Sequence, residues 1–108
     1  MKPSLFDVVE LLVNLPERGL SAGQRGAVVA VYKDEQYEIE LTNAAGETLA
    51  LATLPSDRFM VVWRAETQAW VPLAEQLNAL VAHLSEETRR EVLDFARFVY
   101  GRRQNTPA

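Results

Sequence analysis

The spacing of apolar residues changes once along this chain, near residue 70, and the change divides it into two parts. Up to Arg64 the apolar residues lie in short, β-branched or alternating runs, and glycine-containing loops separate some of them. From Pro72 onward they recur every three or four positions, which is the period of an amphipathic helix. We therefore expect a β domain over residues 1–64, a helical arm over residues 72–104 and a frayed tail at residues 105–108.

The β domain is expected to contain five strands. In residues 37–42 (YEIELT) apolar and polar residues alternate strictly, so one face would be buried while the other, carrying Glu38 and Glu40, would face water. The remaining expected strands are residues 5–15, 27–33, 48–54 and 58–64. Five short strands with no helix between them predict a small antiparallel barrel or sandwich, within a chain of the α+β class that is mainly β.

The arm is expected to form two helices. The first starts at Pro72 and carries a leucine stripe at spacings of four, three and four residues: Leu73, Leu77, Leu80 and Leu84. Such a stripe packs within the chain or against a second copy, so a homo-oligomer is one expected use of it. The second helix follows Ser85, a good N-cap residue, and ends near Gly101.

The second helix is apolar over an arc of about 220°, whereas packing against one neighbour uses little more than about 100°. Two explanations are open: the first helix and the barrel both pack on it, or part of it faces a second protein. The face expected to pack within the chain consists of Val92, Phe95, Ala96 and Val99. Leu93, Phe98 and Tyr100 flank this face and are the candidate contacts with a protein partner, with Phe98 the first choice.

Trp63 and Trp70 flank the junction between the β domain and the arm. Tryptophan buries a large area and is enriched in binding hot spots, so Trp70 is a further candidate partner contact. The alternative is that both rings attach the arm to the barrel.

Enzyme chemistry is not expected from these residues. The chain has no Cys and a single His, His83, so it lacks a cysteine nucleophile, thiolate ligands and a histidine pair for a metal. Its serines lie in no nucleophile motif, and Gly23 and Gly26 are not followed by the residues of a phosphate-binding loop. We therefore predict a non-enzymatic protein without a cofactor or a metal.

The net charge of −4 lies in the β domain. Residues 1–60 hold five Lys or Arg and nine Asp or Glu, whereas residues 61–108 hold six of each kind. An acidic domain suits the phosphates of nucleic acid poorly and suits a basic protein well. Glu38 and Glu40, on the wet face of their strand, are the expected contacts with such a partner.

The N-terminal apolar run is interrupted by Asp7 and Glu10 and does not have the pattern of a signal peptide. No run reaches the roughly 18 to 20 apolar residues of a membrane helix. A cytoplasmic protein with no membrane partner is expected.

Three segments, FDVVELLVNLPERGLSAGQRGAVVAVY, YEIEL and GETLALATLPSDRF, resemble in order a family of short bacterial proteins of unknown function over residues 5–60. That family resembles a small SH3-like barrel and tends to be encoded beside toxin genes. Separately, LSEETRREVLDFARFVYGRR at residues 84–103 is similar to the helical segment of a second, antitoxin-like family of unknown function. The resemblances imply a five-stranded antiparallel SH3-like barrel followed by two C-terminal helices. They also imply an antitoxin-type protein that covers the active surface of a basic toxin encoded nearby.

Two alternatives stay open. Residues 23–29 (GQRGAVV) resemble the loop and strand of nucleic-acid-binding SH3-like barrels, and the contacts would then be Arg25, Arg102 and Arg103. Only Arg18 and Arg25 lie near that loop, so nucleic acid is not the expected partner. A regulatory or structural adaptor is the other alternative.

Overall fold

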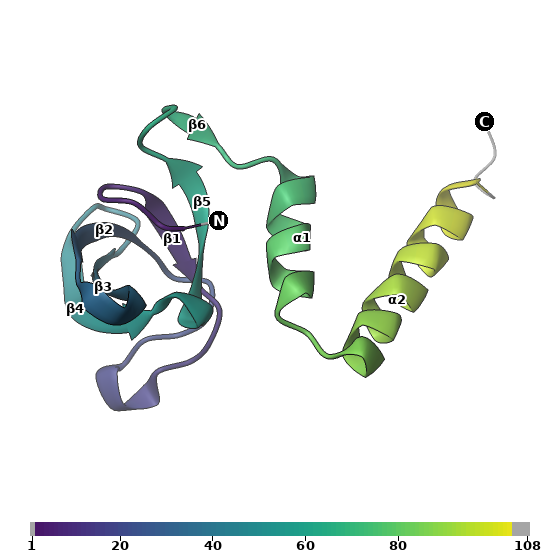
Figure 1. Cartoon of the computed structure of the whole chain (residues 1–108), viewed down its shortest axis with the longest axis horizontal. Coiled ribbons are helices and arrows are strands. Elements are labelled where there is room, and N and C mark those ends of the chain that lie inside the picture. Colours follow the sequence, from purple (N-terminus) through teal and green to yellow (C-terminus); the bar gives the residue numbers. More distant parts are fainter. Residues whose placement is uncertain (1, 105–108) are drawn as a thin grey trace.

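The structure, a computed structural model, describes residues 2–104 and the side chains of residues 2–102. The predicted frayed tail at residues 105–108 lies outside the described residues. Figure 1 shows a β-sheet followed by two helices, so the chain is α+β with its helices at the C-terminus. The strands are β1 (Val8–Leu11), β2 (Arg25–Val31), β3 (Gln36–Thr42), β4 (Thr48–Pro55), β5 (Phe59–Arg64) and β6 (Ala69–Trp70), and the helices are α1 (Leu73–Ala82) and α2 (Glu86–Gln104).

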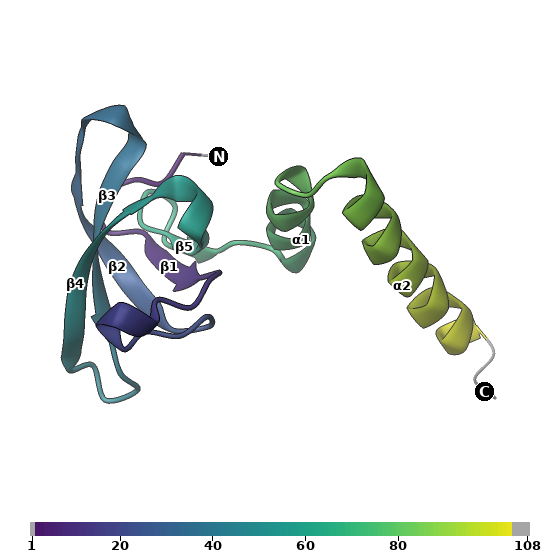
Figure 2. The same cartoon turned by 90° about the horizontal axis from the view of Figure 1, so that it is seen from below.

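All strand pairs are antiparallel, and the strand order is β4-β3-β2-β1-β5-β6. The sheet has six strands rather than the predicted five, because Ala69 and Trp70 pair with Arg64 and Trp63 in a strand too short to show alternation. In the described chain the edge strands β4 and β6 are not paired with each other, so the curved sheet in Figure 2 is not closed by hydrogen bonds.

The first predicted strand, residues 5–15, is much shorter in the structure. Only Val8–Leu11 form a regular strand, because the backbone turns on both sides of β1. Phe6 has a φ of 71°, outside the extended region. After β1, Leu15 and Leu20 exchange backbone hydrogen bonds of 2.9 and 3.1 Å across the loop formed by LPERGL.

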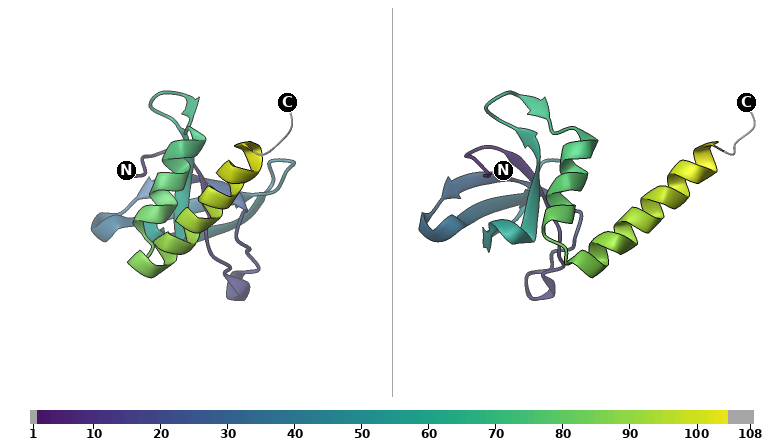
Figure 3. Two further views of the ribbon diagram at one scale, coloured as in Figure 1. Left: turned by 90° about the vertical axis from the view of Figure 1, so that its right-hand side faces the viewer. Right: turned by 45° about the vertical axis from the view of Figure 1, so that its right-hand side comes forward.

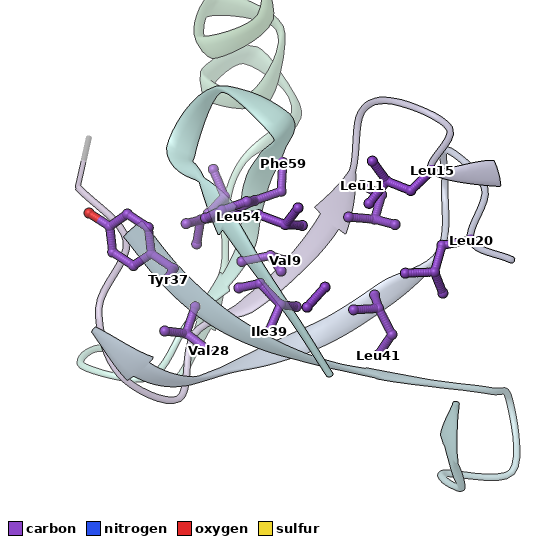
Figure 4. Close-up of a cluster of buried hydrophobic side chains, with 13 residues drawn as sticks. Val9, Leu11, Leu15, Leu20, Val28, Tyr37, Ile39, Leu41, Leu54 and Phe59 are labelled. Atoms are coloured by element: carbon purple, nitrogen blue, oxygen red, sulfur yellow. The ribbon is translucent and has the colours of Figure 1, made fainter. Parts of the chain in front are cut away.

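The predicted alternation in β3 is confirmed, since Tyr37, Ile39 and Leu41 are all buried. These side chains belong to one apolar core enclosed by the curved sheet (Figure 4). Tyr37 meets Phe59 edge to face, with ring centroids 5.7 Å apart. The buried apolar residues are Val9, Leu11, Leu15, Leu20, Val28, Tyr37, Ile39, Leu41, Ala52, Leu54, Phe59, Val61, Val62 and Val71.

The β domain ends later than the predicted boundary at Arg64. Val71 is buried in the core, and its N–H donates a 2.9 Å hydrogen bond to the carbonyl of Val62. No residue of α1 or α2 is buried within the described chain. The β domain therefore extends to Val71, and the arm begins with α1.

Two residues fix the sheet locally. Gly26 lies so close to β3 that a Cβ at this position would overlap the carbonyl of Glu40, so only glycine fits. Asp7 is fully buried, and its carboxylate accepts hydrogen bonds of 2.9 Å from the backbone N–H groups of Ser4 and Ala65. The Asp7 carboxylate therefore connects the start of the chain to the end of β5.

The arm extends away from the β domain (Figures 1 and 3). α1 lies against β5, whereas α2 continues outward, so the molecule measures 47 × 31 × 29 Å. Its radius of gyration is 16.2 Å, compared with about 13 Å for a compact chain of this length. Within residues 2–104, no helix is long and apolar enough to cross a membrane.

Candidate protein-interaction surfaces

α2 is an apolar helix with little cover from its own chain. Phe95 is 67% exposed, Phe98 61% and Tyr100 67%, while Leu93 is about half exposed. Monomeric proteins seldom expose contiguous apolar surface of this kind unless something binds there. The candidate contacts Leu93, Phe98 and Tyr100 are therefore accessible.

The prediction that Phe95 and Ala96 pack within the chain is wrong, because both are exposed. Val92 and Val99 are only partly buried. The reason is the direction of α2, which leaves α1 at their connection and does not return to the sheet (Figure 3). The wide apolar arc is thus not explained by contact with both α1 and the sheet.

The connection between the helices is held by two polar side chains, Ser85 and Arg89. Ser85 caps α2 as predicted, since its hydroxyl accepts a 3.3 Å hydrogen bond from the Thr88 N–H. The Arg89 guanidinium donates hydrogen bonds of 3.0 and 3.1 Å to the carbonyls of Val81 and Ala82 at the end of α1. One cation therefore satisfies the terminal carbonyls of α1 and links the two helices.

The exposed residues of α2 form two flanks. Leu93, Ala96 and Tyr100 follow Arg89 at spacings of four, three and four residues, so they share the side of α2 that Arg89 directs toward α1.

Phe95 and Phe98 form the other flank, with ring centroids 6.3 Å apart and Arg102 placed 5.8 Å from the centre of the Phe98 ring. A partner could thus contact an aliphatic–aromatic flank and an aromatic–cationic flank on the same helix.

The leucine stripe of α1 is also exposed in part. Leu73 is 82% exposed and Leu77 about half exposed, whereas Leu80 and Leu84 are partly buried. The side of α1 that borders the sheet carries Gln76, Ala79 and His83, together with Leu80 of the stripe. Leu80 therefore faces the cleft between α1 and the sheet, whereas Leu73 and Leu77 are exposed.

Trp70 lies on the sheet rather than between the sheet and the arm. Its side chain is 61% exposed, and the Arg25 guanidinium carbon lies 5.6 Å from the centre of its ring. Arg25 also forms a 3.4 Å ion pair with Glu10. Trp70, a candidate contact with protein, and Arg25, a candidate contact with nucleic acid, therefore lie in one patch.

Glu38 and Glu40 face away from the core on β3, as predicted. The two carboxylate oxygens of Glu38 accept hydrogen bonds from the hydroxyls of Tyr32 (3.1 Å) and Thr53 (2.9 Å). The Glu40 carboxylate accepts one from Thr48 at 3.2 Å. The hydrogen bond with Glu38, slight burial and the negative charge of Glu38 raise the pKa of Tyr32. This acidic face therefore has carboxylates in fixed positions.

The structure does not bring the predicted site residues into one surface. β3 and β4 lie at one end of the long axis, and α2 lies at the other (Figures 1 and 2). Of the predicted nucleic-acid contacts, Arg25 is on the sheet, Arg102 is near the end of α2, and the side chain of Arg103 lies outside the described residues. The chain therefore has three separate candidate surfaces: the acidic face with Glu38 and Glu40, the patch of Trp70 and Arg25, and helix α2.

One cavity was missed by sequence reasoning. A cleft of about 350 Å³ lies between α1 and the sheet, with Tyr37, Phe59 and Val71 among its apolar lining and Glu35, Glu75 and His83 among its polar lining. Its walls come from distant parts of the chain, so no local pattern indicates it. Within the described residues, no three His, Cys, Asp or Glu side chains gather closely enough to hold a metal ion.

Comparison with known proteins gives one match. The family model described as a domain of unknown function, DUF4926, matches residues 5–61, which correspond to the β domain up to the middle of β5. Neither the curated proteins nor the solved structures contain a match to the chain.

Proposed function

The chain belongs to the DUF4926 family, whose function is unknown, and we propose that it is an antitoxin-type module whose helical arm covers the active surface of a toxin. The observation that carries the proposal is α2, a 19-residue helix that displays Leu93, Phe98 and Tyr100 to solvent. An amphipathic helix with an unpartnered apolar face is a common means of binding the groove of another protein.

The proposed mechanism is steric. The β domain has its own core and serves as the folded base, for which we propose the SH3-like type because the sheet is antiparallel, short-stranded and strongly curved. The arm reaches beyond this base and needs no rearrangement to meet a partner (Figure 3). Blocking a toxin by contact requires no catalytic group, which agrees with the residues present in the chain.

A basic partner is proposed from the charge of the β domain. Residues 1–60 carry nine acidic and five basic residues, and Glu38 and Glu40 are fixed on the outer sheet face. Because this face and α2 lie at opposite ends, it acts at long range by attracting the partner, while α2 makes the contact. We place this activity in the cytoplasm, where a toxin that acts on RNA would meet it.

The test is binding to the protein encoded beside the gene. The two proteins are produced together, and the dissociation constant of the purified complex is measured for the natural chain and for Phe98→Ala. Loss of a buried aromatic anchor costs about 2 kcal/mol or more, so affinity should fall about thirtyfold. Since Phe98 is exposed, the unfolding midpoint of the free chain should not change.

The matched control is Phe6→Ala, because Phe6 is a phenylalanine of equal exposure, 62%, in the β domain. It should bind like the natural chain. Equal affinity of the Phe98→Ala variant, or no complex with the neighbouring protein, would overturn the proposal. A complex with nucleic acid that weakens steeply with salt would assign the chain to the nucleic-acid-binding class instead.

A further inference from the structure

A second regular stripe runs along α2 and shares Phe95 with the aromatic flank. Thr88, Val92, Phe95 and Val99 follow one another at spacings of four, three and four residues. This is the spacing of the residues that meet in the seam between two packed helices. Phe95, the largest of them, is 67% exposed, so the centre of the seam is uncovered within the described chain. Thr88, Val92 and Val99 are partly buried.

The charges of α2 are divided between its halves. Residues 86–94 hold four acidic side chains and two arginines, whereas residues 95–104 hold three arginines and no acidic side chain. One half is therefore negative and the other positive. A second α2 complements this pattern when it runs in the opposite direction, and repels it when it runs in the same direction.

The rest of the molecule favours the same orientation. The acidic β domain lies at the N-terminal side of α2, so two parallel helices would bring two negative domains together. An antiparallel pair separates them by roughly the length of α2, about 28 Å, which exceeds the screening length of about 8–10 Å at physiological salt. Antiparallel helix dipoles also attract each other.

We propose that α2 pairs with α2 of a second copy in antiparallel orientation. A two-fold axis near residues 93 and 94 places Phe95 of each copy against Val92 of the other, and Val99 against Thr88. All four seam residues are then used, and the contact is the same for both copies, as two-fold symmetry requires.

The pair should be weak and reversible. Phe95 and Phe98 expose roughly two thirds of rings that present about 150–250 Å² each, so pairing removes about 500 Å² of aromatic surface from water. This is small beside the 1,200–2,000 Å² buried in typical specific interfaces, so we expect a dissociation constant in the micromolar range.

The pairing is inferred from α2 itself and holds whether or not the chain is an antitoxin. Its consequence for a partner rests on the proposed function, because the seam adjoins Phe98. A tightly bound partner would then separate the two copies.

The first experiment measures mass by analytical ultracentrifugation from micromolar to millimolar concentration. The natural chain should change from monomer to dimer, and Phe95→Ala should raise the dissociation constant at least tenfold with unchanged circular dichroism. Phe6→Ala should dimerise like the natural chain. A chain that stays monomeric at millimolar concentration, or a Phe95→Ala variant that dimerises normally, overturns the proposal.

The second experiment measures the orientation without altering the seam. The chain has no Cys, so Glu86→Cys and Asp94→Cys each give a single site for a spin label. In the antiparallel pair the labels at residue 86 lie about 22 Å apart along the axis, and those at residue 94 lie almost level. Labels that are level at both positions mean a parallel pair and contradict the proposal.

Discussion

At the scale of single residues, the Glu38 carboxylate on the outer sheet face has a hydrogen-bond partner for each of its two oxygens. It accepts hydrogen bonds from Tyr32 and Thr53, so residues of β3 and β4 and the end of β2 meet at one side chain. The bond with Tyr32 favours the neutral phenol, which is why the pKa of Tyr32 lies above its ordinary value of 10.0. The stability it contributes is therefore present below the pKa of unfolded tyrosine and is lost as pH rises through the raised pKa of Tyr32.

This coupling gives a test with a matched control. Glu38→Gln removes the charge, so the pKa of Tyr32 should decrease toward its ordinary value. Glu40→Gln should leave it unchanged, because Glu40 bonds to Thr48 instead. The measurement is an NMR titration that follows the Tyr32 ring through alkaline pH. Equal effects of the two substitutions would show that net charge, rather than the direct contact with Glu38, sets the pKa.

At the scale of elements, the sequence pattern correctly predicted the elements that are determined by interactions between residues close together in the chain. Alternation located β3, and Ser85 located the start of α2, because both signals lie within a few residues of what they specify. β6 could not be predicted in this way, since Trp70 pairs with Trp63 across a turn and has no pattern of its own. The path of α2 was also missed. An apolar arc indicates that a face needs cover, but it does not say which chain covers it.

The same limit applies to the candidate site. Phe98 was expected to be the residue least covered by packing within the chain, because its position on the helix follows from the helical period, and its side chain is exposed. The pairing of Trp70 with Arg25, and the distance of both from α2, depend on the sheet order and could not be read from spacing.

Arg89 is the residue that should set the relation between the two helices. Arg89→Ala removes both hydrogen bonds to the end of α1, and hydrogen bonds from a charged donor contribute about 1.5–3 kcal/mol each. Both bonds are exposed to solvent, so the net loss should be smaller. α2 should remain helical while its angle to α1 varies more widely. X-ray scattering should then show a broader distribution of dimensions around the 16.2 Å radius of gyration.

The control is Arg90→Ala, since Arg90 makes no contact with α1 among the described hydrogen bonds and ion pairs. It removes the same charge from the next position and should leave the scattering profile unchanged. If both variants behave alike, the angle between the helices is set by backbone packing at Leu84 and Ser85 instead.

At the scale of the whole molecule, the β domain and the arm differ in how they are held. All buried apolar residues lie between Val9 and Val71, and the described part of α1 and α2 adds none. α1 contributes only partial cover over β5, so the β domain should keep its fold without the arm. The family match to residues 5–61 lies entirely within this domain.

Two truncations separate this view from one in which the arm completes the core. A chain that ends at Pro72 retains every buried residue and should keep its β-type circular dichroism and most of its unfolding free energy. A chain that ends at Arg64 loses β6 and Val71, and burial of one valine contributes about 1.5 kcal/mol or more. Its unfolding midpoint should therefore be clearly lower in a urea titration. Were the chain ending at Pro72 to unfold as readily as the shorter one, α1 would be part of the core and the arm would not be a separate binding element.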